Sequence, residues 1–355
     1  MSERASDSAL DLSARRDTLS LQHVSVRAMK NQIRIGILGY GNLGRGAIRA
    51  IEASPDLTLQ GVYTRRDPLT IADRGALPFF TLDALEANRD ELDVLLLCGG
   101  SATDLPEQGP EYARRFVTVD SFDTHAKIPE YFEKVDASAR EGDRLSIIST
   151  GSDPGLFSLH RMLGEAILPS GETYTFWGRG LSQGHSDALR RVPGVKAGVQ
   201  YTIPSEASLD SIRAGARPSL SAAERHRREC FVVAEEGVDR EALREAIVSL
   251  PHYFAEYETS VNFIDEETLA REHAAMPHGG VVLRSATTSS GINQVVEFRL
   301  ALESNPEFTG AVLVAYARAA HRLYARGERG ALTPFDIAPG LLSPRSPAEL
   351  RRELL

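Results

Sequence analysis

Short apolar runs alternate with helical patterns through the first half of the chain. Runs rich in aliphatic residues, typical of buried parallel strands, occupy residues 33–38, 57–64, 93–98, 116–119 and 144–149. Helical patterns follow at residues 45–52 and 81–89 and around residues 111–115. Because strands that alternate with helices through right-handed crossovers form parallel sheets, this pattern predicts an α/β, doubly wound sheet.

A glycine-rich turn joins the first predicted strand to the first predicted helix. Gly39 permits a tight turn, Gly41 lacks the Cβ that would block a pyrophosphate, and Gly44 lets the helix pack close to the strand. Free N–H groups and the helix dipole would hold the pyrophosphate. The motif alone is weak and also fits a plain strand–helix turn, but its context favours a Rossmann-type dinucleotide site. The cofactor residues predicted here are Gly39, Tyr40, Gly41, Asn42, Leu43 and Gly44.

The end of the second strand, Thr64-Arg65-Arg66, indicates which dinucleotide binds. An NAD enzyme usually carries Asp or Glu about 20 residues beyond the glycines. A carboxylate there would repel a 2′-phosphate, whereas guanidinium groups match its geometry and charge. Both arginines could instead be solvated, with Asp67 as the acid, but Asp67 precedes Pro68 in the turn beyond the strand. We therefore expect NADP rather than NAD.

Composition and charge narrow the class of protein. The chain has 355 residues, which favours two domains, and its net charge of −9 argues against nucleic acid or an anionic membrane as a partner. An anion site must then be a local basic pocket. Cys98 and Cys230 have neither a metal nor a redox spacing, which suits a reducing cytoplasm. The histidines form no metal motif, and no apolar run approaches the ~18 residues of a membrane span.

Residues 1–30 require separate treatment because they are rich in Ser, Arg and Asp and lack an apolar core. They are therefore no secretory signal, and four acidic residues by Asp17 weaken the alternative of a transit peptide. We expect a disordered extension. Met29 stands four residues before the first strand, so translation beginning at Met29 is a hypothesis.

Three loops follow predicted strands at the edge of the sheet where ligands bind in doubly wound folds. Each is rich in small residues, and two carry carboxylates, although an Asp at such a position is often only a cap or turn former. The cofactor residues predicted from these loops are Cys98, Gly99, Gly100, Ser101, Ala102, Asp120, Ser121, Asp123, Gly151, Ser152, Asp153, Pro154 and Gly155.

The organisation changes from about residue 155. Strand-like runs recur at residues 174–177, 198–203, 230–234, 261–264, 280–283 and 293–300, with helices at 157–167 and 240–249. This pattern predicts a second, mixed α/β domain. Asn305, as cap, and Pro306 begin a long apolar helix. We expect this helix to return to the first domain, leaving a cleft between the two. The first domain then covers residues 31–152 plus about 305–355, and the second covers residues 153–304.

Several segments together resemble the meso-diaminopimelate dehydrogenase family. They are residues 39–44, 64–66, 97–104, 149–157, 177–191 and 276–280, of which the FWGRGLSQGHSDALRRVPGVK and MPHGG stretches are long and specific. The resemblance spans residues 32–344. It implies NADP-dependent, reversible oxidative deamination of the D-amino acid centre of meso-2,6-diaminopimelate to L-2-amino-6-oxopimelate and ammonia, in lysine and cell-wall precursor metabolism. It also implies a cytoplasmic homodimer, with residues 153–304 binding substrate and forming the dimer.

The resemblance further implies a set of substrate contacts of both charges. Asp123 and Asp153 would accept from ammonium groups as catalytic residues, and Arg228 would clamp a carboxylate. The identity of the proton-accepting base stays open. The substrate residues implied are Asp123, Asp153, Trp177, Gln183, Gly184, Thr202, Arg228, His278 and Asn305.

Each of these residues also has a simpler interpretation that does not involve a ligand. Arg228 lies in a charged run typical of a solvated face, Asn305 already serves as a helix cap, and Trp177 would by default be core. The chain departs from the family pattern at two positions. Ser152 stands where some members carry Trp, which puts the breadth of substrate acceptance in doubt, and Thr64 replaces a frequent Ser but keeps the hydroxyl.

Two other functions stay open from the sequence. One is an NADP-dependent dehydrogenase or reductase acting on another amino acid or on a semialdehyde. The other is a catalytically silent NADP-binding protein that senses redox state or scaffolds a complex. The presence of Asp123 and Asp153 together with Arg228 and His278 argues against silence, because a sensor would not need them.

Overall fold

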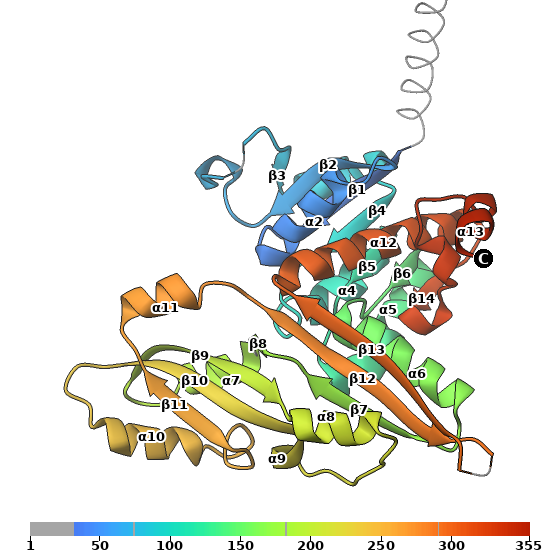
Figure 1. The fold of residues 1–355 in the computed structure, drawn as a ribbon. Coiled ribbons are helices and arrows are strands. Elements are labelled where there is room, and N and C mark those ends of the chain that lie inside the picture. The colour runs from blue at the N-terminus through green and yellow to red at the C-terminus, as the bar shows by residue number, and fades with distance from the viewer. Residues whose placement is uncertain (1–31, 74, 182, 290) are drawn as a thin grey trace, which may run out of the picture. The chain divides into compact units, whose positions relative to one another are not determined.

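A computed structural model describes residues 32–73, 75–181, 183–289 and 291–355 (Figure 1). Contacts between residues divide the chain into two compact units. Unit 1 runs up to Gly151 and includes Thr309–Leu355, and unit 2 is Ser152–Phe308. The predictions of a disordered extension over residues 1–30 and of a start at Met29 concern residues outside the described ranges.

Unit 1 contains a parallel sheet of seven strands in the order β14-β6-β5-β4-β1-β2-β3. The chain order reverses between β1 and β4, which is the topological switch point of a doubly wound fold. The predicted Rossmann-type sheet is therefore confirmed. Its strands are β1 Ile33–Leu38, β2 Leu57–Thr64, β3 Phe79–Thr81, β4 Val94–Leu97, β5 Thr118–Asp120, β6 Leu145–Ile147 and β14 Gly330–Leu332.

Helices α4 and α5 pack together against the sheet around a continuous apolar core. Leu95 and Leu97 of β4, which is buried throughout, meet Tyr112 of α4 and Tyr131 of α5 in this core. Helix α12 is tied to the turn before β2 by a two-pronged ion pair, in which Arg318 Nε and Nη2 lie 2.6 and 2.9 Å from the Asp56 carboxylate. The helices of this part are α2 Asn42–Glu52, α3 Ala84–Ala87, α4 Leu105–Ala113, α5 Ile128–Glu141, α12 Asn305–Ala325 and α13 Pro347–Leu354.

Unit 2 contains two small sheets with strand orders β13-β12-β7 and β11-β10-β9-β8. All neighbours are antiparallel except β10 and β11, and β12 and β13 form a long hairpin (Figure 1). The predicted mixed α/β second domain is thus confirmed as a fold class. The strands are β7 Glu172–Trp177, β8 Gly180–Leu181, β9 Val195–Pro204, β10 His226–Ala234, β11 Thr259–Phe263, β12 His278–Thr287 and β13 Asn293–Leu302.

The described residues of unit 2 also form six α-helices, most of which are short. Only α6 reproduces its predicted limits at both ends, and none of the described helices of the chain is long and apolar enough to cross a membrane. The helices are α6 Phe157–Ile167, α7 Gln183–Arg190, α8 Glu206–Arg213, α9 Ala222–Arg225, α10 Arg240–Val248 and α11 Glu266–Glu272.

Some local expectations were wrong. The helix predicted over residues 81–89 is shorter, because Thr81 ends the unpredicted strand β3 and only Ala84–Ala87 is helical. Asn305 is not the cap of α12 but its first residue. The Ser304 hydroxyl accepts the Glu307 N–H instead, at 3.4 Å. Serine and asparagine are both good caps, so a Ser-Asn pair leaves the boundary ambiguous by one residue.

Candidate functional site

A hollow of about 470 Å³ lies in unit 1 at the carboxyl ends of β1, β2 and β4. Many of the predicted cofactor residues line it, and Asn42, Leu43 and Gly44 begin the adjoining helix α2. The predicted residues in the lining are Gly39, Tyr40, Gly41, Thr64, Arg65, Arg66, Cys98, Gly99 and Gly100. Cys98 is buried, and burial raises the pKa of its thiol to about 12, so this side chain is neutral.

The three glycines of the turn are required for different reasons. Gly39 has a φ of +106°, which favours glycine, and a Cβ on Gly44 would lie 2.2 Å from the Gly39 carbonyl oxygen. A Cβ on Gly41 would meet no described atom within 4 Å. The protein itself therefore demands glycine at two of the positions. At Gly41 the open space in front of the α2 N-terminus fits the close approach of a pyrophosphate.

Three arginines surround the Tyr40 side of the hollow. The Arg66 guanidinium lies 5.7 Å from the Tyr40 ring centroid and donates to the Tyr40 carbonyl oxygen. Arg45 lies 4.7 Å from the same ring and pairs with Asp73 at 3.0 Å. Arg65 has a 71% exposed side chain, and its Nη2 lies 2.9 Å from Asp104 Oδ1. The sequence analysis missed Asp104, which lines the hollow, and Arg45, which contacts the Tyr40 ring.

The strand-end loops of unit 1 are held by the buried carboxylate of Asp120. It accepts from the Phe122 N–H at 2.9 Å, the Ser149 N–H at 3.0 Å and the Tyr131 hydroxyl at 2.7 Å, while burial raises its pKa. Its main-chain oxygen accepts from the N–H and the hydroxyl of Thr150 as well, so the predicted cofactor contact of Asp120 stays a prediction. Asp123, by contrast, is exposed, and its N–H donates to Ser101 Oγ at 2.9 Å.

In unit 2 the strand register brings three predicted substrate residues together. Thr202 of β9 pairs with Gly180 of β8 on one side and with Arg228 of β10 on the other. A Cβ on Gly180 would lie 3.1 Å from His278 Nδ1, so His278 adjoins the same position. Trp177 of β7 pairs with Gly280, which lies two residues beyond His278. The centroids of the Trp177 and His278 rings lie 6.1 Å apart.

Arg228 is the charged centre of this cluster. It is 5% exposed, its Nη1 donates to Thr202 Oγ1, and its guanidinium lies 3.9 Å from the Tyr257 ring centroid. The described residues provide no ion pair to a carboxylate for Arg228, and burial lowers its pKa. A buried, hydrogen-bonded cation without a counter-charge favours an anionic ligand.

Three buried polar atoms in this region lack a hydrogen-bond partner among the described residues: Arg228 Nε, Gln200 Oε1 and His278 Nδ1. Such atoms are costly unless a ligand or water satisfies them. Burial lowers the pKa of His278, partly opposed by Asp153, so a neutral imidazole is favoured. Gln200 was not predicted, because its place beside Thr202 depends on side-chain direction within β9 rather than on a motif.

Asp153 is held by α6. Arg161 Nη2 lies 2.5 Å from its Oδ1 and Arg161 Nη1 lies 3.2 Å from its Oδ2, while Ser158 Oγ donates to Oδ1 at 3.2 Å. The Asp153 side chain is only 5% exposed. Neither Arg161 nor Ser158 was predicted. Arg161 lies one turn into the helix that follows the predicted carboxylate Asp153, and this spacing could have predicted their contact.

The remaining predicted substrate residues are less informative. Gln183 is the first residue of α7, but its side chain lies outside what the structure describes, and Gly184 is exposed in the same helix. The Asn305 N–H donates to the Met276 carbonyl oxygen at 3.1 Å. Along the chain, unit 1 ends and unit 2 begins within the segment that holds Gly151, Ser152, Pro154 and Gly155. The loops after β4 and β5 hold Ala102 and Ser121, respectively.

Comparison with known proteins decides the family. A model described as the diaminopimelic acid dehydrogenase C-terminal domain matches residues 151–304. The meso-diaminopimelate D-dehydrogenase of Ureibacillus thermosphaericus is 57% identical over 325 residues, which make up 92% of this chain and 100% of the relative. The chain belongs to the meso-diaminopimelate dehydrogenase family. The resemblance inferred from the residues is thus confirmed.

Solved structures of meso-diaminopimelate dehydrogenases and an engineered relative have the same fold. A substituted meso-dapdh from Clostridium tetani with DAP is 50% identical, with a TM-score of 0.87 over 91% of this chain and 100% of that chain. An engineered D-amino acid dehydrogenase bound to NADP+ is 42% identical, with a TM-score of 0.78 over the same shares of the two chains.

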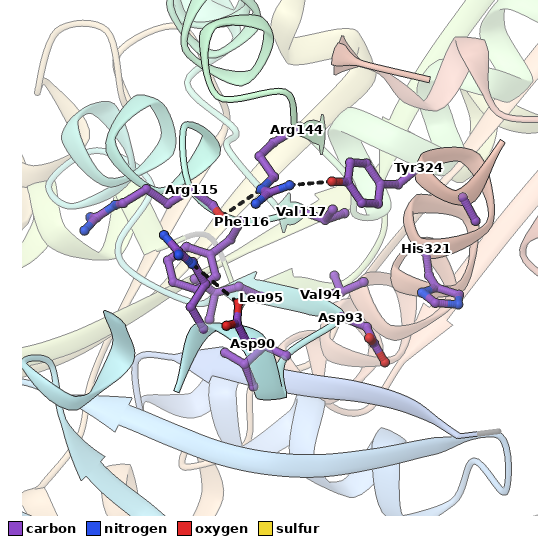
Figure 2. Close-up of a pocket in the computed structure, with 13 residues that line it drawn as sticks. Asp90, Asp93, Val94, Leu95, Arg115, Phe116, Val117, Arg144, His321 and Tyr324 are labelled. Carbon is purple, nitrogen blue, oxygen red and sulfur yellow. Dashed lines mark hydrogen bonds and ion pairs between the residues drawn. The ribbon is translucent and has the colours of Figure 1, made fainter. Parts of the chain in front are cut away.

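This member of the meso-diaminopimelate dehydrogenase family has a second hollow in unit 1, of about 400 Å³, whose lining includes residues just before β4 and β5 (Figure 2). Figure 2 shows Arg144 between the Arg115 carbonyl oxygen and the Tyr324 hydroxyl, to both of which it donates. Arg115 pairs with Glu111 at 2.9 Å, and Arg89 pairs with Glu86 at 2.7 Å. No predicted site residue lines this hollow, and its arginines bond within the protein, so we assign it no ligand.

His226 supports Trp177 and makes the stability of unit 2 depend on pH. Its Nε2 accepts the Trp177 N–H at 2.8 Å, and burial, together with the charges of Arg228 and Arg225, lowers its pKa to about 4. The unfolded chain binds a proton at this residue near pH 6.5, whereas the folded chain does not until about pH 4. The stabilisation is therefore present above pH 6.5 and is lost as pH falls towards 4.

We expect acidification from pH 7 to pH 5 to destabilise the wild type by about 2 kcal/mol more than the His226→Gln variant, which keeps an acceptor but cannot titrate. Thermal unfolding at both pH values measures this difference. His252→Gln, at an exposed histidine of unit 2, is the control and should respond to pH as the wild type does. Equal pH responses of wild type and His226→Gln would contradict the assignment.

Proposed function

We propose that this family member converts meso-2,6-diaminopimelate, NADP+ and water into L-2-amino-6-oxopimelate, ammonium, NADPH and a proton, reversibly. The observation that carries the proposal is the buried Arg228 beside Thr202. Among the described residues it has no carboxylate counter-charge, and its Nε has no hydrogen-bond partner. A substrate carboxylate supplies both the missing charge and the missing acceptor. A catalytically silent NADP-binding protein would have no use for such a buried cation.

The residues of the unit 1 hollow fit NADP. The turn at Gly39, Gly41 and Gly44 leaves open space at the α2 N-terminus for a pyrophosphate. Thr64, Arg65 and Arg66 lie at the end of β2, where the 2′-phosphate of the adenosine ribose binds in this fold. When bound, the nicotinamide ring accepts the hydride that leaves the substrate carbon.

The protein's own contribution is to hold the substrate and to handle its protons. Arg228, with Thr202, binds a carboxylate, and Gln200 Oε1 offers an acceptor to an ammonium group. Asp153 accepts from the second ammonium group. That nitrogen must lose a proton before hydride leaves the adjacent carbon, and we assign the proton to Asp123, Asp153 or a water that one of them holds. Water then adds to the resulting imine of the substrate and ammonium leaves.

The reaction places the protein in the synthesis of lysine and of cell-wall precursors, and we propose a cytoplasmic location. Both described cysteines, Cys98 and Cys230, are buried free thiols, as expected for a reducing compartment. The half-buried Ser152, which precedes Asp153, leaves more room than the Trp of some family members. Acceptance of other D-amino acids is therefore the secondary activity that we expect at this site.

We also propose a homodimer that covers β13. This edge strand is exposed along most of its length and presents Val295 and Val296 at 36% and 43% exposure, while Ile292 before it is 54% exposed. Exposed apolar edge strands are normally covered, because they pair readily with other chains.

For the dimer, light scattering should give twice the 38.7 kDa chain mass for the wild type. Val296→Glu should give the single-chain mass, because a charge would be buried without a partner. Leu69→Glu, at a 76% exposed residue of unit 1, is the control and should remain dimeric. A wild type with the single-chain mass would contradict the proposal.

For the substrate site, the wild type should reduce NADP+ with meso-diaminopimelate and not with the LL isomer, which has no D-centre. Arg228→Met should raise the KM for meso-diaminopimelate by about 30-fold or more and leave the KM for NADP+ unchanged, because a buried charged contact to substrate is lost. NADPH absorbance measures both. Arg227→Met, at the exposed neighbour, is the control. No turnover by the wild type, or an unchanged KM in Arg228→Met, would contradict the proposal.

For the cofactor, the double variant Arg65→Gln with Arg66→Gln should raise the KM for NADP+ by about 100-fold and that for NAD+ by less than about threefold. Two charge-assisted contacts to the 2′-phosphate are lost, and NAD+ makes neither. Initial rates with each cofactor measure the effect. Arg114→Gln removes an exposed arginine that pairs with Glu141 and serves as control. Equal changes for both cofactors would count against a 2′-phosphate site.

A further inference from the structure

Asp153 lies in an arrangement of donors that fixes its carboxylate in one orientation. The donors come from α6, where Ser158 and Arg161 face the loop that carries Asp153. Arg161 engages both oxygens, with Nη2 at 2.5 Å from Oδ1 and Nη1 at 3.2 Å from Oδ2. A guanidinium that spans both oxygens determines the plane of the carboxylate as well as its position.

The Ser158 hydroxyl has a defined direction in this arrangement. Its oxygen lies 3.3 Å from the Gly155 N–H and 3.1 Å from Arg161 Nη2, both of which can only donate. The hydroxyl hydrogen is therefore left for Asp153 Oδ1, at 3.2 Å. Arg161 is itself anchored on the neighbouring strand, because its Nη1 lies 3.4 Å from Thr175 Oγ1 of β7.

Counting acceptor positions shows what remains available on Asp153. Each carboxylate oxygen offers about two lone-pair positions. Oδ1 uses both, for Arg161 Nη2 and Ser158, whereas Oδ2 uses one, for Arg161 Nη1. Counting hydrogen bonds from the described residues, one acceptor position, on Oδ2, is left for a ligand. The Asp153 side chain is only 5% exposed, so little of its surface is open to a ligand.

We propose that Arg161 is a positioning residue for the reaction: it orients Asp153 so that Oδ2 presents one acceptor to the ammonium group of the substrate. This inference rests on the proposed function, in which Asp153 contacts substrate. The Asp153–Arg161 pair is close to neutral, so its contribution is direction rather than net attraction. Misplacement of a reacting group by about 1 Å can cost about 100-fold in rate, which gives orientation a measurable effect.

The test compares Arg161→Met and Arg161→Lys with the wild type in steady-state turnover of meso-diaminopimelate. Arg161→Met should lower kcat by about 10- to 100-fold and leave the KM for NADP+ unchanged. It should also lower the melting temperature, because the buried Asp153 carboxylate loses its counter-charge. Arg161→Lys, which restores one donor and the charge, should recover part of kcat. Arg271→Met is the matched control, because Arg271 pairs with Glu272 at 2.9 Å on the exposed helix α11, and should match the wild type.

The outcomes separate this inference from the proposed function. Absence of wild-type turnover with meso-diaminopimelate would refute the function itself. With an active wild type, an unchanged kcat in Arg161→Met would overturn only the positioning role. Full recovery of kcat together with the melting temperature in Arg161→Lys would also overturn it, because a single restored charge, rather than the two-pronged contact, would then be all that Asp153 needs.

Discussion

The buried carboxylate of Asp120 is the interaction on which the ligand-binding edge of unit 1 depends. Its two oxygens take the N–H groups of Phe122 and Ser149 and the hydroxyl of Tyr131, while its main-chain oxygen takes both donors of Thr150. Removing a carboxylate from water is costly, and these donors offset part of that cost, since burial still raises the pKa of Asp120. Because the partners belong to α5 and to the segments after β5 and β6, one side chain fixes the loop leading to Asp123 and the start of the loop leading to Gly151.

Unit 2 is organised around the opposite problem, a buried cation. Arg228 lies between the Thr202 hydroxyl and the Tyr257 ring. Among the described residues no carboxylate pairs with its positive charge, and burial lowers its pKa. Burial and the charge of Arg228 lower the pKa values of His185 and His226 to about 4, so both imidazoles are neutral at neutral pH. The cluster thus keeps one positive charge and several neutral polar groups, which suits a zwitterionic ligand that brings its own carboxylate.

The sequence predicted those features of the structure that are determined by residues close together in the chain. Gly39 and Gly44 are required by backbone conformation and by a close approach within six residues, so their spacing was sufficient to identify the turn. In the sequence, Arg228 is one of several charged residues in a row, which is typical of a solvated face. Only the pairing of β9 with β10 places it beside Thr202. Gln200, Arg161 and Asp104 were missed for the same reason. Gln200 contacts Thr202, Arg161 contacts Asp153 and Asp104 contacts Arg65. These contacts depend on how the chain folds, and no spacing of residues in a motif predicts them.

Two arginine–carboxylate pairs explain why an acidic chain can hold anionic ligands at defined places. Arg65 and Asp104 pair at 2.9 Å with Arg65 71% exposed, and such surface pairs contribute only about 0–1 kcal/mol. A 2′-phosphate can therefore take Arg65 from Asp104 at little cost. Arg161 and Asp153 pair where the carboxylate is 5% exposed, and separating them would leave a buried charge without its partner. Arg65 can therefore exchange Asp104 for an anionic ligand. Arg161 and Asp153 stay together, and their pairing orients the carboxylate towards a ligand. Local burial, rather than the net charge of −9, decides where this protein binds anions and cations.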